Sequence, residues 1–78
     1  GKIVQLTFVG DSAEQPIITH LIKKFGVDVN ILQGKVSYTQ DGPYGTLFIH
    51  VDGEKAQIDS ALQYIREQQV ELEVMTNV

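Results

Sequence analysis

The first apolar pattern in the chain is an alternation over residues 3–9. Val4, Leu6 and Phe8 fall on one side of this segment, and Gln5 and Thr7 fall on the other. A period of two is typical of a strand with one buried face. The pattern therefore predicts a first β-strand over residues 3–9.

A helical pattern follows a short polar break. Its apolar residues, at helical spacing, are Ile17, Ile18, Leu21, Ile22 and Phe25. We expect the helix to begin between Ser12 and Pro16, because Ser12 and Gln15 have the spacing of a capping box, whereas proline favours the first helical position. Gly26 is well placed for the left-handed residue that ends a helix.

The apolar pattern changes phase within residues 27–39. Its apolar residues are Val27, Val29 and Ile31 at odd positions, then Leu32, Val36 and Tyr38 at even positions. A regular strand keeps one phase, so the change predicts a β-bulge or break near Ile31 and Leu32. Such a bulge would keep the apolar side chains of both halves directed inward, and Asn30 would lie beside it.

Two further strands and a second helix complete the pattern. Residues 40–43 are typical of a turn, and alternation over 47–51 predicts a strand that forms an antiparallel hairpin with the one before. Asp52 and Gly53 end that strand and can cap a helix. The apolar residues of that helix are Ile58, Ala61, Leu62 and Ile65. Alternation over 70–74 predicts a last strand.

The element order is therefore βαββαβ. With right-handed crossovers it predicts an α+β, ferredoxin-like sandwich, in which both helices cover one face of a four-stranded antiparallel sheet. We call the other face the open face. Its expected residues are Gln5, Thr7, Val9, Thr46, Phe48, His50, Glu71, Glu73 and Met75. Their mixed polarity is compatible with edge-to-edge or face-to-face pairing with a second copy.

Composition narrows the function classes. At 78 residues the chain is one small domain, and a net charge of −4 disfavours nucleic acid as a partner. The absence of cysteine excludes disulfides, thiolate metal sites and cysteine nucleophiles. No apolar run has the length of a membrane span. Because the chain begins with Gly1 instead of Met, we expect it to be a piece of a longer protein.

Candidate chemical groups mostly favour structural roles. Ser12 is better explained as a helix cap than as a nucleophile, and residues 10–12 are better explained as a tight turn than as an anion site. His20 and His50 lack the spacing of metal ligands and are expected at the surface. Residues 44–48 resemble an RNA-binding strand in passing, but they carry no basic residue.

Asn30 is the strongest candidate for binding. Its amide carries both a donor and an acceptor, which suits the zwitterionic end of an amino acid. The residues alone favour the alternative, in which Asn30 stabilises a turn or bulge. Glu71 and Glu73 are what a solvated sheet face should show, so they indicate no carboxylate pair.

Four segments resemble the NIL domain, which is named after the sequence Asn-Ile-Leu found here at Asn30, Ile31 and Leu32. The segments, in the order that the family has them, are residues 6–10 with Ser12, 25–32, 42–47 and 70–74. The resemblance runs along the whole chain. It implies that residues 1–78 form a single NIL domain, with an ACT-like version of the fold derived above.

The resemblance also implies a function. NIL domains regulate bacterial methionine ABC importers from the C-terminus of the ATP-binding subunit, so this domain would sense a ligand and would not be an enzyme. L-methionine would bind between two copies of the domain and inhibit further uptake. Asn30 would contact the ligand, with Ile31 and Leu32 completing the motif. No catalytic residue and no metal ligand is implied.

Partners and location follow from the same resemblance. The domain would pair as a homodimer and meet the membrane permease subunit through its parent protein, at the cytoplasmic face of the membrane. It would hold no cofactor, because ATP and Mg²⁺ would bind in the ATPase domain outside this chain. Two alternatives stay open: a structural dimerisation module without a ligand, and a NIL domain fused to an iron–sulfur ferredoxin.

Overall fold

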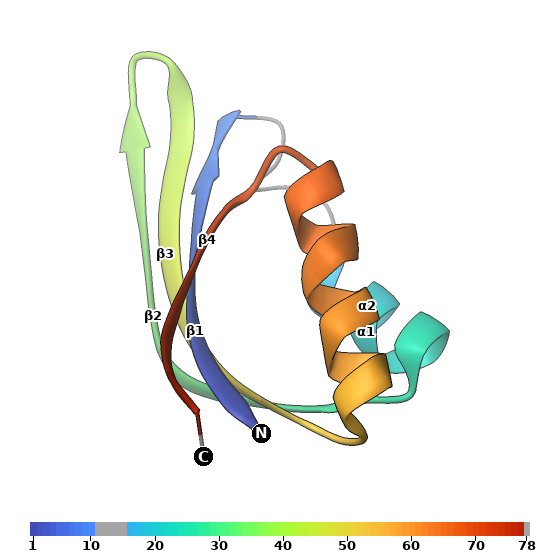
Figure 1. Ribbon diagram of the computed structural model, residues 1–78. Coiled ribbons are helices and arrows are strands. Elements are labelled where there is room, and N and C mark those ends of the chain that lie inside the picture. The colour runs from blue at the N-terminus through green and yellow to red at the C-terminus, as the bar shows by residue number, and fades with distance from the viewer. Residues whose placement is uncertain (11–15, 78) are drawn as a thin grey trace.

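A computed structural model of the protein describes residues 1–10 and 16–77. Its elements are β1 (Lys2–Val9), α1 (Ile17–Phe25), β2 (Asp28–Thr39), β3 (Gly42–Asp52), α2 (Lys55–Glu67) and β4 (Glu71–Asn77). They form two layers, with the sheet on one side and both helices on the other (Figure 1). The predicted βαββαβ, ferredoxin-like fold is confirmed.

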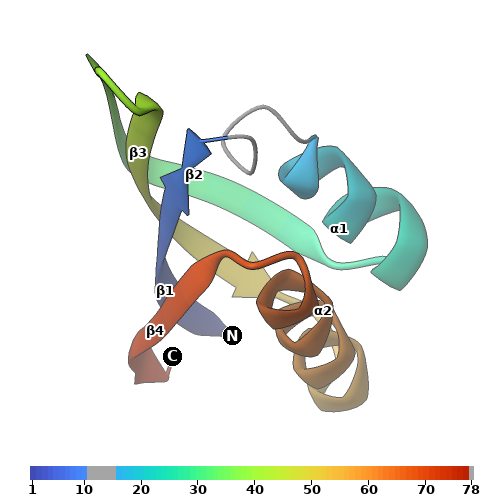
Figure 2. The same cartoon turned by 90° about the horizontal axis from the view of Figure 1, so that it is seen from above.

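The sheet has the order β2-β3-β1-β4, and every neighbouring pair is antiparallel. β3 and β1 are therefore the central strands, and β2 and β4 are the two edges. Seen from above, α1 and α2 lie side by side over the same face of the sheet (Figure 2). The open face carries none of the described helices, as the sequence predicts.

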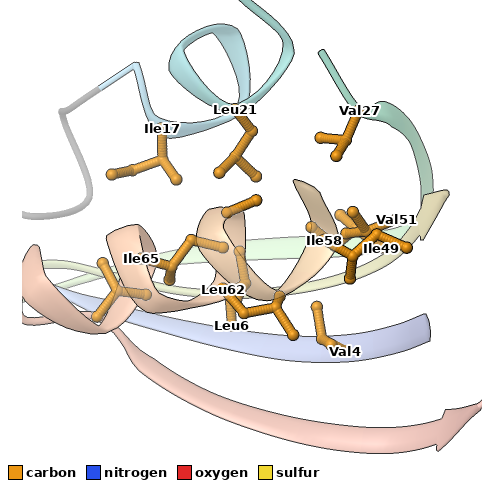
Figure 3. Close-up of a cluster of buried hydrophobic side chains, with 12 residues drawn as sticks. Val4, Leu6, Ile17, Leu21, Val27, Ile49, Val51, Ile58, Leu62 and Ile65 are labelled. Atoms are coloured by element: carbon orange, nitrogen blue, oxygen red, sulfur yellow. The ribbon is translucent and has the colours of Figure 1, made fainter. Parts of the chain in front are cut away.

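The core fills the space between the layers. Val4 and Leu6 of β1 lie beside Ile49 and Val51 of β3 on one face of the sheet, and residues of both helices pack over them (Figure 3). The helical members of this cluster are Ile17, Leu21, Ile58, Ala61, Leu62 and Ile65. The four apolar residues predicted for the second helix are all buried, because their spacing aligns them in one stripe along α2.

Helix α1 begins at Ile17, and Pro16 occupies the N-cap position. The predicted capping by Ser12 lies outside the described residues. Gly26 ends the helix with φ of 67°, and its N–H donates to the carbonyl oxygen of Ile22 at 3.1 Å. A left-handed residue at this position favours glycine, so the predicted helix end is confirmed.

The predicted bulge in β2 is also confirmed. Ile31 pairs with Ile49 and Gln33 pairs with Phe48, which leaves Leu32 as the extra residue. The bulge places Val36, opposite Gly45, on the same helix-facing side as Ile31, as expected, but the second half of the strand is not buried there. Val36 is 62% exposed and Tyr38 is 83% exposed. The reason is that the β2–β3 hairpin extends beyond the helices, which cannot cover its tip (Figure 1).

The hairpin turn is shorter than predicted. Thr39 pairs with Gly42, so the connection consists of Gln40 and Asp41, and Pro43 belongs to β3. The hydroxyl of Thr39 accepts from the Asp41 N–H at 3.2 Å and donates to the Gly42 carbonyl at 2.9 Å. Pro43 has no backbone N–H, but the pairing of β1 with β3 ends opposite Tyr44. No hydrogen bond to β1 is therefore lost at Pro43.

The predicted cap of the second helix, at Asp52 and Gly53, is wrong. Glu54 is the N-cap of α2, and its N–H donates to Oε1 of Gln57 at 3.3 Å. Asp52 instead accepts from the Gly53 N–H at 3.0 Å, which closes the turn after β3. Glu54 and Gln57 have the spacing of a capping box, and this interaction explains why the helix begins after Gly53.

Candidate functional site

The three motif residues lie on the outer edge strand of the sheet. Asn30 pairs with His50 of β3, on the open face. Ile31 pairs with the buried Ile49 and therefore faces the helix side, although it is 56% exposed. Leu32 is the extra residue of the bulge and is 49% exposed. The structure thus brings an amide and two aliphatic side chains to one exposed irregularity.

This arrangement is open in a single copy of the chain. β2 pairs with β3 on one side only, so the backbone of its other edge has no strand partner among the described residues. Neither of the two hollows described for this structure is lined by Asn30, Ile31 or Leu32. A ligand touching these three residues in one copy would remain largely in water, whereas ligand sites normally enclose most of the ligand.

An apolar groove lies on the helix side, between α1 and the β2–β3 hairpin. Its volume is about 470 Å³, and its main apolar walls come from Phe8, Ile17, Ile18, Val36 and Leu47. Gly34 and Gly45 belong to its floor. A methyl group at Gly34 would lie 2.9 Å from Cδ1 of Leu47, so the end of the Leu47 side chain would have to move to make room for it.

The apolar spacing along the chain did not predict this groove. Phe8, Ile17, Ile18 and Leu47 all have the spacing of core residues, and each does contact the core. The groove exists because α1 is short and covers only part of the sheet near β2. The sequence signal that could have indicated it is Gly34, a glycine within the predicted strand segment of residues 27–39.

The two histidines do not meet. Nδ1 of His20 lies 2.7 Å from the hydroxyl of Tyr64, so His20 joins α1 to α2 in the helical layer. His50 lies on the sheet, and its Nε2 is buried without a hydrogen-bond partner in the described part of the chain. Among the described residues there is no group of three side chains suited to hold a metal ion.

Asp59 of α2 forms ion pairs with two lysine side chains. Lys55 lies 3.0 Å from Asp59, and Lys2 of β1 lies 3.8 Å from it. The hydrogen bond from Lys55, aided by the charges of Lys55 and Lys2, holds the pKa of Asp59 below its ordinary value. These groups lie on the exposed side of the helix, where they contribute to solubility and little to stability.

Glu71 and Glu73 are both exposed on β4, as predicted for a solvated strand. Gln5 pairs with Glu73 and Thr7 with Glu71, so an acidic row follows this edge of the open face. Neither helix that the structure describes is long and apolar enough to cross a membrane.

These features define the class of the protein as a ferredoxin-like α+β domain whose candidate site lies on an exposed, bulged edge strand. The profile of the NIL domain matches residues 2–74. The chain belongs to the NIL domain family.

Several relatives show the protein context of this domain. The chain is 68% identical over 75 residues to the methionine import ATP-binding protein MetN of Halalkalibacterium halodurans, covering 96% of this chain and 22% of that protein. It is 59% identical over 78 residues to MetN of Bacillus subtilis, covering all of this chain and 23% of that protein. The chain therefore spans less than a quarter of the relatives it matches, and it corresponds to their C-terminal part.

A solved structure agrees with the fold. The C-terminal domain of an ABC transporter ATP-binding protein from Enterococcus faecalis superimposes with a TM-score of 0.86 at 41% identity, covering all of this chain and 87% of that one.

Proposed function

We propose that this domain senses L-methionine for a methionine ABC importer and inhibits uptake when the ligand accumulates. The chain would be the C-terminal regulatory part of an ATP-binding subunit, at the cytoplasmic face of the membrane. The proposal is supported by the relatives, which are named as methionine import ATP-binding proteins. ATP and Mg²⁺ would be handled by the rest of that subunit, which would also contact the permease.

The observation that carries the proposal is the exposure of Asn30, Ile31 and Leu32 together at the bulge of an edge strand. The two exposed aliphatic side chains offer apolar surface to a ligand, and a thioether is a suitable apolar neighbour for them. The amide of Asn30 can donate to a carboxylate or accept from an ammonium group. Because this site is open in one copy, we place the ligand between two copies.

Inhibition requires that methionine bind one arrangement of the two domains more tightly than another. A ligand with equal affinity for both arrangements would shift nothing. The arrangement with closed ATPase domains would therefore have to bind methionine less tightly, and ATP turnover would in return weaken methionine binding.

Calorimetric titration of L-methionine into the chain tests this function. The matched pair of variants is Asn30→Ala and Gln33→Ala, because both residues are exposed amides on β2. We expect saturable heat for the parent, a loss of at least about tenfold in affinity for Asn30→Ala, and no change for Gln33→Ala. Absence of heat at concentrations where sedimentation shows dimers would contradict the sensor function.

A structural dimerisation module is the second candidate. It is favoured by one observation, that the motif residues line neither described hollow. This module predicts a stable dimer that gives no heat with methionine, so the same titration separates the two functions.

A further inference from the structure

We propose that the open face of the sheet packs against the part of the ATP-binding subunit that lies outside this chain, on a surface that carries lysine and arginine side chains. The inference rests on the proposed function in one respect, that this chain is the C-terminal part of such a subunit. It depends neither on the ligand nor on how two copies pair.

The open face has an apolar centre that no described helix covers (Figure 1). Ile3 of β1 and Phe48 of β3 lie on the two central strands of this face, and both side chains are partly exposed. Nearer the hairpin, Tyr44 pairs with Val9, and these residues are 45% and 57% exposed. An apolar centre with a polar rim is the usual composition of a protein interface.

The rim of the open face carries an excess of negative charge. Glu71 and Glu73 lie along β4, and Asp28 begins β2 on the same face. These three carboxylates form no ion pair in the described part of the chain, whereas Asp59 of the helical layer lies beside two lysines. Lys35 is the single lysine or arginine of this face among the described residues. Two such faces would repel each other, so the charge favours a basic partner over a second copy.

The size of the face favours a partner that is covalently attached. Four strands with a spacing of about 4.8 Å, each about seven residues long on this face, give an area of about 450 Å². A stable complex of two free proteins usually buries about 800 Å² on each partner. A tethered partner needs less area, because the tether raises its effective concentration to about the millimolar range.

The connection to the rest of the subunit lies at this face. The chain corresponds to the C-terminal part of its MetN relatives, so the rest of such a subunit would join at Gly1. Gly1 lies against His50, because a methyl group on Gly1 would be 2.5 Å from Nε2 of His50. This nitrogen is buried and has no hydrogen-bond partner among the described residues. The tethered part would therefore reach the domain at one end of the open face.

Hydroxyl-radical footprinting of the full-length subunit tests the contact. The isolated chain is the reference, since a related C-terminal domain is known as a separate structure. Tyr44 and Tyr38 are a matched pair, because both are exposed tyrosines of the β2–β3 hairpin, Tyr44 on the open face and Tyr38 on the helix side. We expect oxidation of Tyr44 to fall at least about fivefold in the full-length subunit, and that of Tyr38 to change less than about twofold.

Charge variants of the full-length subunit test the nature of the contact. Glu71→Lys should raise the oxidation of Tyr44 at least about threefold, towards the value of the isolated chain. Glu67→Lys is the control and should leave it unchanged, since Glu67 is an exposed glutamate at the end of α2 in the helical layer. A salt concentration of about 0.5 M should act like Glu71→Lys, because it shortens the screening length to about 4 Å.

Three outcomes overturn the inference: equal oxidation of Tyr44 in the isolated chain and the full-length subunit, equal protection of Tyr44 and Tyr38, or protection of Tyr44 that survives both Glu71→Lys and added salt. The proposed function fails separately. A covered open face in a subunit that gives no heat with methionine contradicts the sensor function alone, whereas an exposed open face in a subunit that binds methionine contradicts this contact alone.

Discussion

Leu21 and Ile22 are neighbours on α1 with the same hydrophobic character, yet the structure gives them different roles. Leu21 is fully buried between the helices and the sheet, whereas Ile22 is 46% exposed. The change Leu21→Ala removes three carbon atoms, which costs about 2.4 kcal/mol in transfer free energy. The cavity left between well-packed elements adds about 1 kcal/mol or more, so we expect a total loss of about 3–4 kcal/mol.

This loss is large for a chain of 78 residues, whose free energy of unfolding should be about 4–12 kcal/mol. With a urea m-value near 1 kcal/mol per M, the midpoint of unfolding should fall by about 3 M. Ile22→Ala is the matched control and should cost less than about 1 kcal/mol. Urea titrations followed by circular dichroism measure both variants. Equal midpoint shifts for the two variants would refute the helix orientation described here.

Two further predictions concern polar contacts of the helices. The pKa of Asp59 is lowered in the folded protein, so the stabilising contribution of its carboxylate is present above the ordinary value of 3.8 and is lost as the pH falls below it. In urea titrations, the difference in stability between the parent and Asp59→Asn should therefore shrink as the pH falls below 3.8. A difference that does not change with pH would contradict the ion pair. Tyr64→Phe removes the contact with His20 and should cost about 0.5–1.5 kcal/mol in thermal unfolding, whereas no loss would show that water replaces the hydroxyl.

The fold was predictable because its elements carry distinct periods. The four buried residues of α2 and the alternation of β1 follow from spacing alone, and the bulge at Leu32 follows from a change of phase. The irregularity of β4 at Met75 was not predictable. Val4 pairs with Val74 and Ile3 pairs with Thr76, so Met75 is an extra residue in the pairing of β4 with β1. The apolar alternation of β4 ends before Met75, so the sequence shows no change of phase there.

The candidate site was predictable only in part. The sequence pointed to Asn30, Ile31 and Leu32 as a motif beside a strand irregularity, and the structure shows that irregularity on an exposed edge. Their contact with methionine stays a prediction. The groove beside α1 was not expected, because Phe8 and Leu47 have the spacing of fully buried residues and no local pattern reveals where a short helix stops covering the sheet.

The sequence by itself determined the order of elements, the helix end at Gly26 and the phase change within β2. These properties depend on residues close together in the chain, where steric limits and side-chain periodicity act. Only the tertiary structure decided that β2 lies at an edge, that Val36 and Tyr38 are exposed, and that Leu21 is buried while Ile22 is not. Exposure depends on which distant segments cover a side chain, and this is a property of packing between layers that local spacing does not contain.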